Sequence, residues 1–191
     1  MKVAGLFAGI GGFELGFKRA GHETGILCEI LPAARAVLQA HFPNVELTAD
    51  VRDLKALPRD VEIVCAGFPC QDLSQAGQTL GLDGERSGLI GQVLRLLRSE
   101  RPEWLVVENV PFMLQLRGGD AMRRIVDAIE DVPGYRWAWR VLDSLAFGLP
   151  QRRKRVYLIA SRVADPADVL LVDQVEFSRP GTSLEKLAHG F

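Results

Sequence analysis

The chain has 191 residues, with 23 basic side chains against 24 acidic ones and a formal net charge of -1 at pH 7. A content of 48% hydrophobic and 25% charged residues is typical of a globular protein. A chain of this length buries about 70% of its unfolded surface without needing disulfides. These numbers exclude a disordered chain, a collagen and a disulfide scaffold, and they predict one domain.

No apolar run approaches the ~18 residues of a membrane-spanning helix, and the N-terminus leads directly into glycines. We therefore expect a soluble, unexported protein of a bacterial-type cytosol or nucleoid. Three unpaired cysteines and three scattered histidines indicate neither a disulfide framework nor a metal site. The near-neutral charge disfavours a domain that alone grips a long stretch of nucleic acid.

Apolar runs alternate with helical patterns along most of the chain, which is typical of an α/β protein with a mostly parallel sheet. The spacing predicts strands at residues 2–7, 23–28, 45–47, 61–66, 104–107, 136–142 and 155–160. It predicts helices at 12–20, 33–41, 89–97 and 122–129. Beyond residue 163 the regular pattern fades.

In open α/β sheets, ligands bind at the carboxyl ends of the strands. The segments that follow predicted strands are residues 7–12, Glu29, Asp50, 67–74 and 108–110. The irregular stretch 67–86 is unusually long for a loop inside a compact domain, and such loops are usually functional or disordered. We therefore expect the functional residues at this edge of the sheet.

Residues 7–12 (FAGIGG) follow the first strand and open a helix, so their glycines permit a tight turn and a close ligand. The spacing is not G-x-G-x-x-G and no Walker lysine follows, which disfavours a pyrophosphate cradle. Glu29 ends the second strand, where a carboxylate can accept hydrogen bonds from both ribose hydroxyls. Together the glycine turn and Glu29 imply an adenosyl ligand, although a glycine turn beside an exposed glutamate occurs in many α/β proteins.

Three further motifs carry reactive side chains. Cys70 follows Pro69 in the loop after a buried strand, whereas Cys65 lies within that strand and Cys28 within another, as small buried hydrophobes do. Glu108 ends the next strand, where partial burial would favour a protonated carboxyl; an ordinary helix cap is the alternative. In residues 151–155 (QRRKR), alternation places Arg153 and Arg155 on one face, either toward a pocket or in a solvated charged surface.

Taken in chain order, these motifs closely resemble the cytosine C5 DNA methyltransferases, over about residues 2–162. The resemblance implies a Rossmann-like fold that binds S-adenosylmethionine, with helices on both faces of the sheet. By this resemblance Phe7 would stack on the adenine, Gly9 and Gly11 would admit the methionine portion, Glu29 would hold the ribose, and Asp50 would accept from the adenine amino group. Gly12 and Pro69 would belong to the same cofactor site.

The resemblance also implies the chemistry. The Cys70 thiolate would attack C6 of cytosine, because C5 is otherwise a poor nucleophile. Glu108 would bond N3 and the exocyclic amine, and Arg155, helped by Arg153, would bind the base O2. Since C5 and C6 are buried in double-stranded DNA, the target cytosine must be flipped out.

Members of this family continue further, with a target-recognition region and a returning segment. We therefore expect residues 1–162 to form the cofactor-binding and catalytic domain, incomplete at its C-terminus, and 163–191 to form an irregular tail toward the recognition region. Three interpretations remain open: a fragment, one subunit of a split enzyme with a C-terminal partner, or a non-catalytic remnant that binds cofactor or a partner. A tRNA cytosine methyltransferase is the alternative enzyme.

Overall fold

The computed structural model describes residues 1–68 and 88–171, apart from the side chains of residues 116 and 117. Pro69, Cys70 and the end of the predicted tail (172–191) lie outside these described residues. The strands are β1 (Lys2–Leu6), β2 (Glu23–Cys28), β3 (Glu46–Thr48), β4 (Val61–Ala66), β5 (Trp104–Asn109), β6 (Arg136–Asp143) and β7 (Lys154–Ser161). The helices are α1 (Gly12–Arg19), α2 (Pro32–His41), α5 (Leu89–Glu100), α6 (Asp120–Glu130) and α7 (Pro166–Leu170), with short 3-10 turns η1 (Pro111–Leu114), η2 (Leu116–Gly119) and η3 (Ser144–Phe147).

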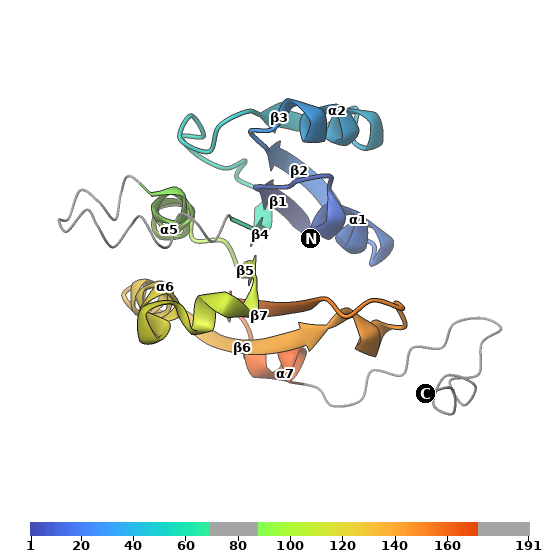
Figure 1. Cartoon of the computed structure of the whole chain (residues 1–191). Coiled ribbons are helices and arrows are strands. Elements are labelled where there is room, and N and C mark those ends of the chain that lie inside the picture. Colours follow the sequence, from blue (N-terminus) through green and yellow to red (C-terminus); the bar gives the residue numbers. More distant parts are fainter. Residues whose placement is uncertain (69–87, 172–191) are drawn as a thin grey trace.

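The seven strands of the described residues form one sheet in the order β3-β2-β1-β4-β5-β7-β6. The five strands from β3 to β5 pair in parallel, and β7 pairs antiparallel with both β5 and β6. Figure 1 shows α1 and α2 on one side of the sheet and α5 and α6 on the other. The predicted fold class, a mostly parallel sheet with helices on both faces, is confirmed.

The main core lies between the sheet and the α5–α6 side. Helix α6 buries Met122, Ile125 and Ile129, whose spacing puts them on one face of the helix. On the other side, Phe13 and Phe17 of α1 pack against buried residues of the sheet that include Cys65. Helices α1 and α6 therefore each bury one apolar stripe, which explains why the sequence periodicity predicted them.

Helix α7 corrects the expectation that residues 163–191 are irregular throughout, since it lies within that segment. Asp165 caps it by accepting a hydrogen bond from the backbone N–H of Ala167 at 3.0 Å, and Pro166 occupies its first turn. This is an ordinary helix start, but five residues are too few to produce a visible apolar period. The helix packs against β6 (Figure 1).

The strand directions decide where the site lies. Because β1, β2, β4 and β5 are parallel, their carboxyl ends share one edge of the sheet. Strand β7 runs the opposite way, so it begins at that same edge, with Asn109 of β5 opposite Val156. The basic residues just before Val156 are thereby placed beside the end of β5.

No helix within the described ranges is both long and apolar enough to cross a bilayer.

Candidate active site

A cavity of about 840 Å³ lies at the carboxyl edge of the sheet. The glycine loop, residues 7–12, lines it with Phe7, Gly9 and Gly12. Glu108 from the end of β5, Arg155 from the start of β7 and Arg153, which directly precedes β7, line it as well. Six residues singled out from the sequence therefore meet in one cavity, whereas Gly11, Glu29 and Asp50 do not line it.

Glu29 fastens the glycine loop to the end of β2. Its side chain is buried, and its two carboxylate oxygens accept hydrogen bonds from the backbone N–H groups of Gly9 and Leu31, each at 2.8 Å. The loop begins at Phe7, whose backbone is left-handed (φ 55°), and the Phe7 ring meets Phe68 edge-on at 6.4 Å. Glu29 therefore shapes the loop, and a ribose would share its carboxylate with these two N–H groups.

The missing side chains of Gly11 and Gly12 leave space in two different places. Gly11 is left-handed (φ 88°), and a Cβ there would lie 2.9 Å from Phe42 Cε2 and 3.0 Å from Leu38 Cδ2. Its missing side chain thus leaves room for α2 rather than for the cavity. A Cβ on Gly12 would meet nothing within 4 Å among the described residues, and Gly12 lines the cavity.

We expect Gly11→Ala to lower the free energy of unfolding by about 2 kcal/mol, because alanine adds both backbone strain and overpacking against α2. Gly12→Ala is the matched control, and its stability should stay within about 0.5 kcal/mol of the parent. Urea unfolding of the two variants measures both values. Equal stability of the two variants would contradict this assignment.

Asp50 is held by a neighbouring arginine. Arg52 Nη2 lies 2.6 Å from Asp50 Oδ2, and Arg52 Nε lies 3.0 Å from both carboxylate oxygens. The backbone N–H of Arg52 also donates to Oδ1 at 2.9 Å. These hydrogen bonds from Arg52 hold the pKa of Asp50 below its usual value. An adenine amino group would have to share this carboxylate with the guanidinium.

Glu108 and Arg155 form an ion pair at the cavity. Arg155 Nε lies 2.7 Å from Glu108 Oε1, and about a fifth of each side chain is exposed. Glu108 is thus partly buried and lies beside a cation, whereas the sequence interpretation had considered partial burial alone. A Cβ on Gly67 would lie 3.4 Å from Glu108 Oε2, so the pair also borders the segment that leads to Cys70.

Two residues at this edge had no assigned role in the sequence interpretation. The buried Asn109 donates from Nδ2 to the carbonyl oxygen of Phe68 at 3.0 Å, which ties the end of β5 to the segment after β4. Tyr157 lines the cavity and stacks edge-on against Phe13 of α1, with ring centroids 6.2 Å apart. Burial, followed by the charge of Glu108, raises the pKa of Tyr157. Its place two residues after Arg155 was a usable signal, since alternate strand residues share a face.

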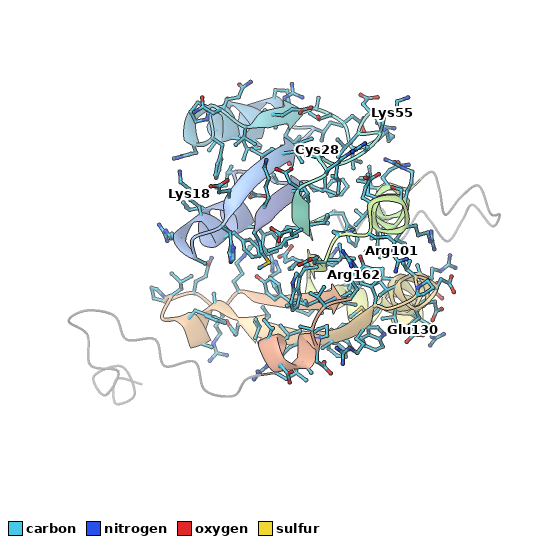
Figure 2. All side chains as sticks on the ribbon, turned by 180° about the vertical axis from the view of Figure 1, so that it is seen from behind. Lys18, Cys28, Lys55, Arg101, Glu130 and Arg162 are labelled. Carbon is cyan, nitrogen blue, oxygen red and sulfur yellow. The ribbon has the colours of Figure 1, made fainter. Side chains whose placement is uncertain are left out.

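The two described cysteines, Cys28 and Cys65, are unsuited to nucleophilic chemistry. Cys28 lies inside the molecule (Figure 2), and burial together with the nearby carboxylates of Asp50, Glu29 and Asp53 raises its thiol pKa to about 12. Burial, and secondarily Glu14, raises the pKa of Cys65 well above its ordinary value. Neither thiol ionises near neutral pH, so only Cys70 remains as a candidate nucleophile.

Curated proteins and solved structures that resemble this chain include two bacterial methyltransferases and an insect protein. The chain is 49% identical over 174 residues to the type II methyltransferase M2.BsuMI of Bacillus subtilis, which covers 89% of this chain and 44% of the relative. It is 31% identical over 179 residues to M.AquIA of Picosynechococcus, covering 85% of this chain and 72% of that protein. A crystal structure of Spodoptera frugiperda DNMT2 superposes with a TM-score of 0.67 at 21% identity, covering 84% of this chain and 50% of that one.

The matches cover different shares of the two relatives. The chain spans less than half of the Bacillus subtilis protein but almost three quarters of M.AquIA. The DNMT2 likeness supports the fold alone, because the sequence identity is low. The family model for C-5 cytosine-specific DNA methylases matches residues 1–187. The chain therefore belongs to the C-5 cytosine-specific DNA methylase family.

Proposed function

We propose that this chain carries the cofactor-binding and catalytic part of an S-adenosylmethionine-dependent DNA cytosine C5 methyltransferase of the restriction-modification kind. The observation that carries the proposal is the shared cavity. There the glycine loop meets the Glu108–Arg155 ion pair, beside the segment that leads to Cys70. A cofactor held by the loop and a base held by the ion pair would thus lie next to each other.

The described residues fit an adenosyl cofactor. The Cβ positions of Gly9 and Gly12 face open space in the structure, so the backbone presents a cradle that side chains would fill. Phe7 offers an aromatic ring, and Glu29 and Asp50 offer carboxylate acceptors at the ends of β2 and β3. When bound, S-adenosylmethionine supplies an electrophilic methyl group. We assign Phe7, Gly9, Gly12, Glu29 and Asp50 to its binding, together with Pro69, and Gly11 to the packing that shapes the loop.

The protein side chains supply the remaining chemistry. The Cys70 thiolate adds to C6 of the cytosine, which makes C5 nucleophilic enough to take up the methyl group that the cofactor would supply. After methylation a base removes the C5 proton, the C6–Sγ bond breaks, and Cys70 leaves as a thiolate. Glu108 bonds N3 and the exocyclic amine and assists proton transfer as the thiolate adds. Arg155 orients Glu108 through their 2.7 Å contact and, with Arg153 in the same cavity, bonds the base O2.

DNA binding must draw on protein beyond these 191 residues. A net charge of -1 releases few counterions, and extruding a paired base costs a few kcal/mol. The relatives supply a source for the missing contacts, since more than half of M2.BsuMI lies outside the matched region. We propose that a further C-terminal region or a separate partner chain provides target recognition. In M.AquIA the part outside the matched region is smaller, since the match covers 72% of that protein.

We expect the chain alone to bind duplex DNA weakly and to methylate it poorly. Adding the unmatched part of M2.BsuMI as a separate chain should raise DNA affinity and turnover together, with strong salt dependence only in the mixture. Transfer of labelled methyl groups to DNA of mixed sequence, with tRNA as the comparison, measures turnover. Robust sequence-specific methylation by the chain alone would contradict the partner requirement. Transfer to tRNA but not to DNA would show that the substrate is tRNA and not DNA.

A further inference from the structure

Glu14, in the first turn of α1, is a buried carboxyl outside the cavity. Only 1% of the residue is exposed, and neither carboxylate oxygen has a hydrogen-bonding partner among the described residues. A Cβ added to Gly5 of β1 would lie 1.8 Å from Glu14 Oε1 and 3.1 Å from Leu27 Cδ2. The carboxyl therefore fills the space of an absent side chain on β1, between apolar neighbours.

Helix α1 and the neighbouring strands carry ionisable groups, but none of the described ones forms a hydrogen bond or ion pair with the Glu14 carboxyl. From β4 the thiol of Cys65 faces it, and that thiol stays protonated because its pKa is strongly raised. From β2, Glu23 is exposed and Glu29 is held by backbone N–H groups. Lys2 of β1 pairs with Asp60, Glu62 of β4 lies 3.8 Å from the N-terminal amino group, and Lys18 of α1 lies over the Phe42 ring.

An ionised carboxylate without a partner is costly to bury. Burial accordingly raises the pKa of Glu14 to about 7, against a smaller opposing effect of its own backbone N–H. Protonation of Glu14 stabilises the fold. This contribution is fully present below about pH 4.5, which is the ordinary pKa of a glutamate, and it is lost as the pH rises through the raised pKa of about 7. Ionisation of Glu14 therefore weakens the packing of α1 on β1 above neutral pH.

The contact between Gly5 and Glu14 joins the two ends of the glycine loop. Gly5 stands two residues before Phe7, where the loop begins, and Glu14 stands two residues after Gly12, where α1 begins. The loop thus spans the interval between two residues that are pressed together. Its backbone conformation depends on that contact as well as on the hydrogen bond from Gly9 to Glu29.

We propose that Glu14 is a positioning residue for the glycine loop: its protonated carboxyl keeps the loop in the conformation that binds cofactor, and its ionised form loosens the loop. Cofactor affinity then falls at alkaline pH, by at most tenfold for each pH unit above the midpoint, since one proton is coupled to binding. This inference rests on the proposed function only for the identity of the cofactor.

The test uses the full chain and S-adenosylhomocysteine as the probe. We expect ¹³C NMR of labelled glutamate to show one carboxyl, absent in Glu14→Gln, that titrates near pH 7. Calorimetry between pH 6 and 9 should show probe affinity falling with pH in the parent and in the control Glu23→Gln. Affinity should change less than about twofold in Glu14→Gln and Glu14→Leu, which cannot ionise.

Identical pH profiles in the parent and in Glu14→Gln would overturn the proposal, as would an ordinary titration of Glu14. Amide hydrogen exchange in α1 provides a readout that needs no cofactor. It should reveal easier opening above pH 7 in the parent and not in Glu14→Gln. If the probe binds at no pH, the cofactor site itself fails, and the exchange and NMR results still decide the role of Glu14.

Discussion

We expect Cys70→Ser to abolish methyl transfer in an active assembly while leaving the affinity for S-adenosylmethionine largely unchanged. A serine hydroxyl stays protonated at neutral pH and is a far weaker nucleophile than a thiolate, so it cannot add to C6 of cytosine. The comparison of labelled methyl transfer with cofactor binding by calorimetry separates lost chemistry from lost binding. A variant with near-normal turnover would remove Cys70 from the mechanism.

The chain provides its own controls for this experiment. Cys28 and Cys65 are buried, and burial raises the pKa of both thiols far above neutral. Cys28→Ser and Cys65→Ser should therefore retain turnover per folded molecule and lose only stability, because each places a hydroxyl in an apolar site. If either variant folded normally and lost all methyl transfer, the nucleophile would be that cysteine and not Cys70.

We expect Glu108→Gln to reduce turnover by about 10²–10⁴-fold, which is the usual contribution of an acid–base group. Glutamine keeps the shape of the side chain and its carbonyl still accepts from Arg155, which lies 2.7 Å from the native carboxylate. Glutamine carries no carboxylate charge, and its amide is too weak an acid to donate a proton to the base. Single-turnover methyl transfer in the assembled enzyme measures the effect on the chemical step.

A matched control for Glu108 is Glu62→Gln on the neighbouring strand β4. Glu62 also makes an ion pair, with the N-terminal amino group at 3.8 Å, but it does not line the cavity. Its replacement should leave turnover unchanged. The Glu108–Arg155 pair is partly exposed, so its loss should cost only about 1 kcal/mol of stability. Turnover of Glu108→Gln within a few-fold of the parent would assign Glu108 to structure alone.

Local pattern was sufficient to place most strands and helices. The expected strand at 104–107 is β5 (Trp104–Asn109), and the expected strand pair near the end is β6 and β7. Such segments are long enough to show a period, because each buries one face or lies wholly within the sheet. Helix α7 was missed since its five residues carry a cap and a proline but no period.

The sequence also determined which residues stand at the carboxyl ends of the strands, and hence the family and the candidate site. Phe7, Glu29, Asp50 and Glu108 all follow or end predicted strands, and parallel strands bring such ends to one edge. Cys70 remains a prediction from the sequence, because it lies outside the described residues. Its assignment therefore depends on the family motif and on the inertness of the other two cysteines.

Only the tertiary structure decided which of these side chains interact. Arg155 meets Glu108 because β7 runs antiparallel beside β5 in a particular register, which no local pattern encodes. Gly11 serves the packing of α2, and Glu14 lies buried against Gly5, through contacts between segments that are separate in the chain. Local periodicity determines which face of an element is buried, whereas partners across the sheet depend on strand order, direction and register.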